Sequence, residues 1–537
     1  MFCQSKKDSI FALSKPIDCA MLKLPIGLQS FASLRTDGFA YVDKTKLVYD
    51  LTHNGKYIFL SRPRRFGKSL LLSTLKAYFQ GKRELFEGLA VSELEQEWES
   101  YPVLYIDLNV GLYTSNEGLW EALNSNLSFL EKTNGITKET NDNAQRFRDI
   151  IWNLATKTGK KVVILVDEYD KPLIHAIDDA ALQQEFRNTL KAFYGNLKTC
   201  DEYIRFAMLT GVSKFSKISL FSDLNNLQDI SLDERYTDIC GLTAEEIEST
   251  FGEHLEAFAQ KEGMTKADIM EQMRKMYDGY HFSKTASKDM YNPFSVLNAL
   301  AQCDFGNYWF STGTPTFLVK LLQNGEYDLQ DFSNGDLLAS DLAAKESLRQ
   351  EPLAMFYQTG YLTIKRYEKE FGSYRLGFPN REVEQSFLKF LLPRFTGNTD
   401  NGASAFIEYF VRDLRKGDNE SFLGRMRSFF ASTPYELVRD LENHYQTVMF
   451  TICRLLGYYT KAEYHTSNGR INMVVKANQF TYIFEFKFNK TAQEALAQID
   501  TKEYALPFQA EGQKVFKVGV NFSKETRNID DFIWKEA

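Results

Sequence analysis

The residues Gly67, Lys68 and Ser69 stand between an apolar run and a leucine-rich segment. The apolar run at residues 57–60 predicts a buried strand, and the leucines that follow Ser69 have the spacing of a helix. This order of strand, loop and helix is typical of a phosphate-binding P-loop, because the unpaired N–H groups at a helix N-terminus attract phosphate. We therefore expect Lys68 to reach the β- and γ-phosphates of a nucleotide, and the Ser69 hydroxyl to ligate Mg²⁺.

The loop before this motif is rich in arginine where the common pattern has glycine. The pattern GxxxxGK(S/T) asks for a first glycine at the position that Arg62 occupies in this chain. Arg64 and Arg65 follow in the same loop, and we predict that they bind the nucleotide together with Gly67. The alternative is a glycine-capped turn whose arginines are only solvated.

Two acidic residues end a second apolar run. Asp167 and Glu168 follow residues 162–166, which suit the centre of a parallel sheet covered on both faces. The carboxyl ends of parallel strands border the crevice in which α/β proteins bind ligands, so both acids are expected beside the P-loop. We predict that Asp167 holds Mg²⁺ and that Glu168 orients and deprotonates the attacking water.

A further polar residue is expected at the same edge of the sheet. Thr210 ends the predicted strand at residues 204–210 and is predicted to sense the γ-phosphate or the attacking water. A simple Thr-Gly turn is the alternative. Strands and helical segments alternate from residue 57 to residue 211, so the fold class is α/β, with a parallel P-loop sheet flanked by helices.

The C-terminal part of the chain carries a different pattern. Short strands at residues 463–466, 470–475 and 481–488 alternate with tight turns, which predicts antiparallel hairpins followed by a helix at residues 492–504. Glu485 and Lys487 are two positions apart, so both side chains lie on one face of their strand.

Composition limits the class of protein. With 537 residues the chain is long enough for several domains. The net charge of −7 argues against a protein that coats nucleic acid, although a local basic cluster surrounds the P-loop. The six cysteines are scattered without a CxxC pair, which indicates no zinc site or disulfide framework and fits a reducing cytoplasm. No apolar run approaches the ~18 residues of a membrane helix, so no membrane association is expected.

Four segments follow from these patterns. The long third segment reads as a helical lid or linker that contains a small helix–strand–turn unit at residues 351–379, which we interpret as winged-helix-like. No chemistry is evident in it. The predicted segments are an N-terminal extension at 1–20, a P-loop domain at 21–250, the helical region at 251–430 and a C-terminal α/β domain at 431–537.

The order of the sequence blocks resembles a known family. The blocks LPIGLQSF, FLSRPRRFGKSL, VDEYDKP, LTGVSKFSKISLFSDLNNL, YDGYHFS and YNPFSVLNAL are similar to those of the AAA-ATPase-like family of bacterial P-loop proteins. The resemblance covers about residues 21–300 and includes the arginine-bearing loop. It implies ATP as the nucleotide and the roles given above to Lys68, Ser69, Asp167 and Glu168. Arg235 is a candidate charge-stabilising arginine, with a surface ion pair as the alternative.

The C-terminal pattern resembles the core of a PD-(D/E)XK nuclease, a restriction-endonuclease-like α/β fold. The resemblance implies that Glu485 and an acid on the preceding strand hold Mg²⁺ near the scissile phosphate, and that Lys487 positions the water. Glu442 is similar to the accessory acid of this superfamily, while Gln498 and Tyr504 resemble its trailing residues. Fusion of such a domain behind an AAA-ATPase-like module is itself characteristic of the family.

One residue departs from the nuclease pattern. The family shows Asp where this chain has Asn472, and a neutral amide is a weaker ligand for a hard cation than a carboxylate. Asn472 is either a natural replacement or an introduced one, and the intact surrounding motif favours an introduced change. Glu463 is a candidate substitute ligand. We expect nuclease activity to be weakened or lost with Asn472 in place.

Two functions of different classes follow. The first is an ATPase that gates a Mg²⁺-dependent nuclease-like domain acting on nucleic acid, with DNA favoured over RNA. The second is an ATP-switched regulator that binds nucleic acid or protein through a nuclease fold that does not cut. The expected cofactors are ATP and Mg²⁺, and self-association into a homo-oligomer is left open.

Overall fold

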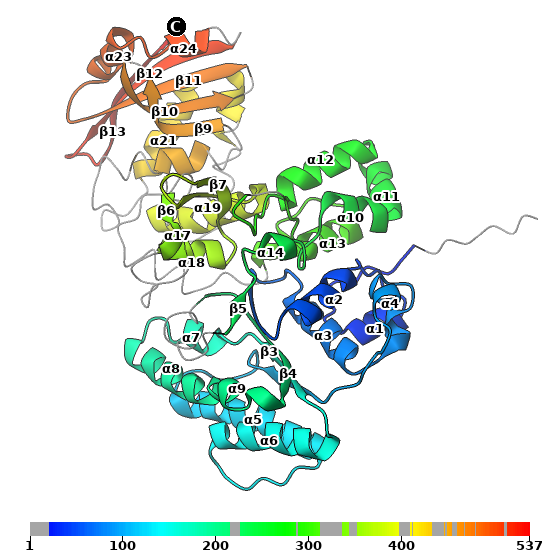
Figure 1. The fold of residues 1–537 in the computed structure, drawn as a ribbon. Helices are drawn as coiled ribbons and strands as arrows, with labels where there is room; N and C mark the ends of the chain where they lie inside the picture. Colours follow the sequence, from blue (N-terminus) through cyan, green and yellow to red (C-terminus); the bar gives the residue numbers. More distant parts are fainter. Residues whose placement is uncertain are drawn as a thin grey trace, which may run out of the picture.

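The computed structural model describes the chain from Met21 to Ala537 except for several internal segments. The described residues exclude 1–20, 215–225, 286–287, 312–335, 343–351, 397–408, 411, 432–444, 446–447, 454–458, 467, 478 and 510–512. The predicted N-terminal extension and the predicted metal ligand Glu442 therefore lie outside the described residues. Figure 1 shows the P-loop sheet and the C-terminal sheet at opposite ends of the molecule, with a mixed helical and strand region between them.

The P-loop sheet has five strands in the order β2-β3-β4-β1-β5, and all its neighbours are parallel. This confirms the predicted α/β class and the predicted strands. The register pairs Ser61 with Gly211 and Asp107 with Asp167, so the polar residues that end these strands meet at one edge. The strands are β1 (Tyr57–Ser61), β2 (Val103–Asp107), β3 (Val162–Asp167), β4 (Ile204–Gly211) and β5 (Gln228–Asp229).

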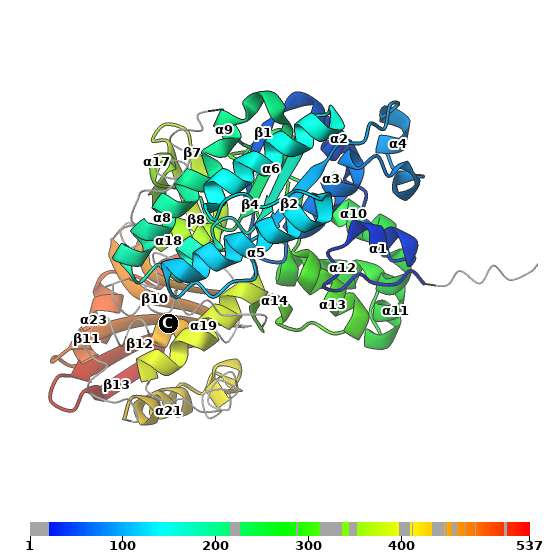
Figure 2. The ribbon, with the colours of Figure 1, turned by 90° about the horizontal axis from the view of Figure 1, so that it is seen from below.

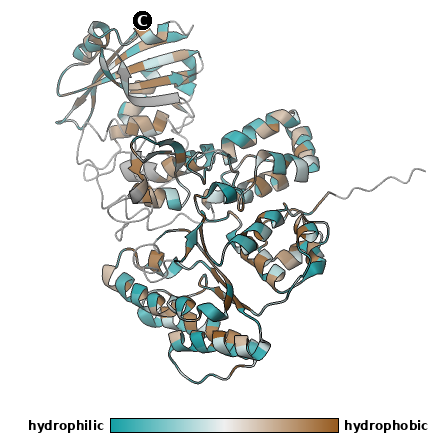
Figure 3. Cartoon of the chain, viewed as in Figure 1, coloured by the Kyte–Doolittle hydropathy of each residue, from teal (hydrophilic) through white to brown (hydrophobic). Residues whose placement is uncertain are grey.

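Helices cover both faces of this sheet. The connection from β1 to β2 passes through α3 (Lys68–Phe79), and the connection from β2 to β3 passes through α5 (Asn116–Asn134) and α6 (Asn143–Thr158). Because such crossovers are right-handed and these two run in opposite directions along the sheet, α3 packs on one face and α5 with α6 on the other (Figure 2). The strands are accordingly apolar along most of their length (Figure 3).

A helical subdomain follows the P-loop sheet and has its own core. Phe258, Ile269 and Val296 are among the buried residues that fill it. Capping boxes at Thr243 and Thr265 fix the starts of two of its helices, because each threonine hydroxyl accepts a backbone N–H of the first turn. The helices are α10 (Ala244–Thr250), α11 (Gly252–Glu262), α12 (Lys266–Tyr277) and α13 (Pro293–Gln302).

The middle region packs directly on the P-loop domain. Phe356, Tyr361 and Phe387 belong to the same buried cluster as the strands of the P-loop sheet. Its three strands have the order β6-β8-β7, with antiparallel neighbours, so the predicted helix–strand–turn unit is present. Its elements are α14 (Tyr308–Ser311), β6 (Asp336–Leu338), α17 (Ala339–Leu342), α18 (Pro352–Gln358), β7 (Thr363–Glu368), β8 (Ser373–Gly377) and α19 (Arg381–Thr396).

The C-terminal sheet has five strands in the order β13-β12-β11-β10-β9. Strands β9, β10 and β11 are antiparallel neighbours, and β13 is antiparallel to β12. Strand β11 pairs in parallel with β12 through the crossover helix α23. Helix α21 (Asn419–Ala431) shares the core of this sheet, with Phe422 and Phe484 in contact. The elements are β9 (Tyr459–Thr466), β10 (Gly469–Ala477), β11 (Phe480–Phe488), α23 (Ala492–Thr501), α24 (Leu506–Gln509), β12 (Lys514–Ser523) and β13 (Asn528–Glu536).

Across the described residues, none of the helices is both long enough and apolar enough to cross a membrane.

Candidate nucleotide site and C-terminal acidic site

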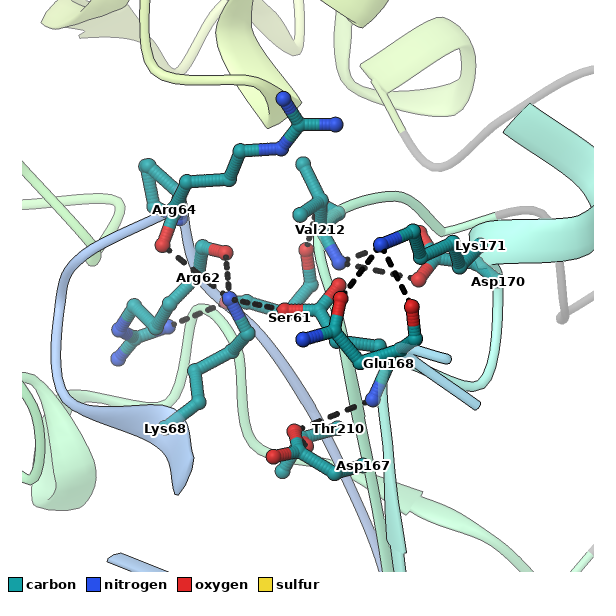
Figure 4. Close-up of polar contacts among 12 residues, drawn as sticks. Ser61, Arg62, Arg64, Lys68, Asp167, Glu168, Asp170, Lys171, Thr210 and Val212 are labelled. Carbon is teal, nitrogen blue, oxygen red and sulfur yellow. Dashed lines mark hydrogen bonds and ion pairs between the residues drawn. The ribbon is translucent and has the colours of Figure 1, made fainter. Parts of the chain in front are cut away.

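The P-loop connects β1 to α3 and folds around the Lys68 amine. Gly67 caps the helix with a φ of +95°, in a region that favours glycine, and Arg65 has a φ of +68°. Lys68 is buried, and its Nζ donates to the carbonyl oxygens of Arg62 at 3.1 Å and Pro63 at 3.3 Å. It also forms an ion pair with Glu168 at 3.4 Å (Figure 4). The loop and the end of β3 are thereby joined through one cation.

Arg62 does not face the nucleotide site. Its guanidinium is buried and donates to the carbonyl oxygens of Ser61, Ser231 and Tyr236, and it stacks over the Phe282 ring at 4.2 Å. Burial lowers the pKa of this guanidinium. Arg62 is therefore not part of a basic surface available to phosphate, because its side chain is buried and its hydrogen bonds lie inside the protein.

Asp167 is buried beneath the P-loop and held by neighbouring strands. Its Oδ1 accepts the Thr210 hydroxyl at 2.8 Å and the Glu168 N–H at 3.1 Å. Its Oδ2 accepts the Tyr105 hydroxyl at 3.3 Å. Thr210 is itself fully buried, so in this structure its hydroxyl orients Asp167. Glu168 has a φ of +51°, an unusual backbone conformation that turns its side chain toward Lys68.

A cavity of about 600 Å³ opens at this edge of the sheet. It brings together most of the predicted nucleotide-binding residues, while Asp167 and Thr210 lie below its wall. Four cationic side chains face one acid in it, so the cavity favours an anion. The predicted residues that line it are Arg64, Arg65, Gly67, Lys68, Ser69 and Glu168.

Sequence reasoning missed three residues at the far end of this cavity. Lys171 Nζ donates to the backbone oxygen of Asn109 at 2.9 Å, and His175 lies beside them. Burial, followed by the charges of Lys171 and Arg64, lowers the pKa of His175, which favours its neutral form. Asn109 follows β2, and parallel strands end at the same edge of a sheet. Asn109 could therefore have been predicted at this site from the sequence.

A fourth missed residue stabilises the loop after β4. Asp170 is fully buried and accepts the N–H groups of Val212 and Ser213 and the Ser213 hydroxyl. Burial and the nearby Glu168 carboxylate raise the pKa of Asp170 to about 6. The sequence shows an acid three residues after Asp167. It does not show the hydrogen-bond partners of Asp170, which are 42 and 43 positions away in the chain.

Apolar residues line the cavity together with the cations. They include Leu28, Ile174 and, at the start of α13, Pro293, Phe294 and Leu297. The Arg65 guanidinium lies over the Phe294 ring at 4.9 Å. A smaller apolar cavity of about 110 Å³ adjoins it and shares Gly67 and Leu70. The cavity thus offers cations suited to phosphates and apolar side chains suited to a flat ring.

The C-terminal site forms where β10, β11 and α23 meet. Glu485 is buried, and its Oε1 accepts Lys487 Nζ at 3.2 Å and Gln498 Nε2 at 2.5 Å. Lys487 Nζ also donates to Gln498 Oε1 at 2.6 Å. The structure therefore brings Glu485 and Lys487 together with Gln498. Glu463 lies on β9, within Tyr459–Thr466.

Asn472 lies next to this group and is engaged with the backbone. The backbone pairing between β10 and β11 begins at Met473, which is paired with Phe484. Asn472 directly precedes Met473, and its Oδ1 accepts the Phe486 N–H at 2.8 Å. The amide oxygen is thus used to hold the two strands together at the edge of the site.

Comparisons with known proteins agree with this architecture. Residues 25–221 match the family model described as predicted AAA-ATPase, and residues 440–532 match the PD-(D/E)XK nuclease superfamily. The chain is also similar to the "uncharacterized protein in vnfD 5'region" of Azotobacter chroococcum mcd 1, with 37% identity over 523 residues that cover 95% of this chain and 98% of that protein. The chain belongs to the AAA-ATPase-like family with a C-terminal PD-(D/E)XK nuclease-superfamily domain.

The two sites of this AAA-ATPase-like protein differ in how well they suit Mg²⁺. At the P-loop, the Ser69 hydroxyl and the Asp167 carboxylate are oxygen donors of the kind that Mg²⁺ shares with nucleotide phosphates. At the C-terminal site, the described side chains in contact contain one carboxylate, that of Glu485. No group of three or more His, Cys, Asp or Glu side chains able to hold a metal ion occurs in the described part of the chain.

The candidate arginine Arg235 of the AAA-ATPase-like domain is occupied elsewhere. It forms an exposed ion pair with Asp233 at 2.6 Å, which is the surface alternative considered from the sequence.

Proposed function

We propose that this protein binds and hydrolyses ATP at the P-loop site and that the nucleotide state acts on the C-terminal nuclease-superfamily domain. The observation that carries the proposal is the cationic cavity in which Lys68, Ser69 and Glu168 meet above the buried Asp167. The matching family model supports ATP as the nucleotide.

The contacts of Lys68 suggest how ATP enters. Its amine now donates to two carbonyl oxygens of its own loop and pairs with Glu168. The phosphates of ATP offer a stronger, charge-assisted partner, so Lys68 leaves these positions when ATP binds. Glu168 then loses its cation and becomes available to deprotonate water, while Thr210 and Tyr105 keep Asp167 fixed. Ser69 and Asp167 would hold Mg²⁺, whose charge would offset that of the phosphates.

Two matched variants test the ATP site. K68A removes the phosphate-binding amine and is expected to abolish ATP binding, which calorimetry measures directly. E168Q keeps the shape of the side chain but removes the base, so ATP still binds while turnover falls by about 100-fold or more. ATPase activity in K68A equal to that of the unchanged protein would contradict the assignment.

At the C-terminal site we propose a Mg²⁺-dependent nuclease fold acting on DNA, with its activity reduced by Asn472. Lys487 and Gln498 hold the Glu485 carboxylate in place, which is the arrangement expected around a metal-binding acid. Asn472 brings no negative charge, and its oxygen is engaged with Phe486. By analogy with other groups that act in the transition state, this loss lowers the rate by ~100-fold or more.

The second candidate is an ATP-switched regulator that binds nucleic acid or protein without cutting. It is favoured by the presence of one carboxylate, that of Glu485, among the described side chains of the site, and by the use of the Asn472 oxygen in strand pairing. The N472D variant separates the two candidates in an assay of DNA cleavage with Mg²⁺. Cleavage in N472D but not in the unchanged chain supports the nuclease. No cleavage by either chain, together with DNA or protein binding that changes with ATP, supports the regulator.

A further inference from the structure

Five consecutive residues of the P-loop contact parts of the chain that lie more than 200 positions away. No residue of this loop segment relies only on its own neighbours for its position. The contacts are Arg62 with Phe282, the Arg64 carbonyl with Trp309, Arg65 with Phe294, and Phe66 with Tyr280 and Phe282. Pro63 lies so close to Gly360 that a Cβ added at Gly360 would be 2.6 Å from the Pro63 Cβ.

These contacts hold a loop whose backbone is strained. Arg65 has a φ of +68°, a conformation that residues with a Cβ rarely adopt, so it persists only when its surroundings fix it. On one side its guanidinium lies over the Phe294 ring at 4.9 Å. On the other side the peptide that precedes it is held by Trp309, whose indole Nε1 donates to the Arg64 carbonyl at 3.0 Å.

Trp309 is itself fixed by a buried acid. Its backbone N–H donates to Glu382 Oε1 at 2.7 Å, and the other oxygen of Glu382 accepts the Ser295 hydroxyl at 2.7 Å. The Trp309 ring packs edge-on against Tyr361 with centroids 5.1 Å apart. Trp309 and Glu382 are both buried, so the indole N–H is presented to the loop in one orientation.

The direction of the Arg64 carbonyl matters for phosphate binding. A P-loop holds phosphate with backbone N–H groups that point into the site. The carbonyl groups of Arg62 and Pro63 accept the Lys68 amine, whereas the Arg64 carbonyl has a different donor. This donor is the indole of Trp309, which is not among the residues that line the cavity. In Figure 4 the side chain of Arg64 also extends away from the Lys68 amine.

We propose that Trp309 is a positioning residue for nucleotide binding: its indole N–H holds the Arg64 carbonyl outward, and Glu382 fixes Trp309 for this task. The inference rests on the proposed ATP site and assigns part of that site to the middle region of the chain. Nothing in the P-loop sequence itself indicates this residue.

The test compares W309F with W152F, a control at a tryptophan whose side chain is half exposed. Phenylalanine keeps an aromatic ring against Tyr361 but lacks the N–H. Calorimetry with a non-hydrolysable ATP analogue and Mg²⁺ is expected to show about tenfold weaker binding for W309F, the size of one hydrogen bond, and unchanged binding for W152F. In steady-state kinetics the KM for ATP rises similarly, while kcat at saturating ATP stays within about twofold because the catalytic acids are unchanged.

The outcomes distinguish this inference from the proposed function. If the unchanged protein does not bind the analogue, the ATP site itself is wrong. If it binds and W309F binds equally well, the role of Trp309 is wrong.

A second measurement covers the case in which W309F does not fold. The unchanged protein is labelled with ¹⁵N-tryptophan, and the indole resonance of Trp309 is assigned by substituting the other four tryptophans one at a time. This resonance is expected to shift when the analogue binds. An unshifted resonance in a protein that binds the analogue overturns the inference.

Discussion

At the scale of single residues, the arginine in place of the first P-loop glycine has a structural reason. A glycine at this position would leave the carbonyl groups of Ser61, Ser231 and Tyr236 without the donors that the Arg62 guanidinium now supplies. Buried carbonyl groups without partners cost free energy, so the loop tolerates a bulky residue because that residue satisfies its surroundings. In the proposed site, Lys68 binds phosphate at the other end of the loop.

The titration of Glu382 should make the free energy of unfolding depend on pH. Burial raises its pKa from 4.5 to about 7, against the lowering effect of its hydrogen bonds to Ser295 and Trp309. Between pH 4.5 and 7 the folded protein therefore holds a proton that the unfolded chain has released. The free energy of unfolding then falls as pH rises through this range, by up to about 1.4 kcal/mol per pH unit from this group.

We expect E382Q to remove this part of the pH dependence. Glutamine has no charge to bury, its oxygen can accept the Trp309 N–H, and its amide can donate to the Ser295 hydroxyl. Melting temperatures measured from pH 5 to pH 8 should therefore decline less steeply in E382Q than in the unchanged protein. Parallel curves for the two proteins would show that Glu382 does not titrate in this range.

At the scale of elements, much of the P-loop domain could be predicted because its signals are local. Apolar runs of a few residues identify the strands β1, β3 and β4, and the spacing of the leucines identifies the helix α3. Since parallel strands end at the same edge, the sequence also placed Glu168 beside Lys68, and the ion pair at 3.4 Å agrees. In the C-terminal domain the alternation of residues 481–488 likewise placed Glu485 and Lys487 on one face of β11.

The rest depends on contacts between distant parts of the chain. The donors to the Asp170 carboxylate, and the Ser231 and Tyr236 carbonyls that accept the Arg62 guanidinium, lie on distant elements, so no local pattern reveals them. The strands β12 and β13 were not predicted, although β12 is buried along most of its length, because a short apolar run does not by itself separate strand from helix. The middle region looked like a linker, yet Tyr361 and Phe387 complete the core of the P-loop domain.

At the scale of the whole molecule, α19 links the two ends. Near its start Glu382 fixes Trp309 against the P-loop. Further along, Phe387 belongs to the core of the P-loop domain, and the adjacent Leu388 belongs to the core of the C-terminal domain. We therefore expect a change in the P-loop to reach the C-terminal core through this helix, although the two sheets lie at opposite ends of the molecule (Figure 1).

This arrangement predicts that nucleotide state controls the C-terminal domain once its missing charge is restored. In N472D, DNA cleavage with Mg²⁺ is expected to rise about tenfold or more when ATP is added, a coupling of the size common between distant sites. K68A/N472D should cleave at the same rate with and without ATP, because the loop no longer binds the phosphates, and E485Q/N472D should not cleave at all. Gel assays of a labelled DNA duplex measure all three variants. Equal cleavage by N472D with and without ATP, in a protein that binds ATP by calorimetry, would show that the link through α19 carries no control.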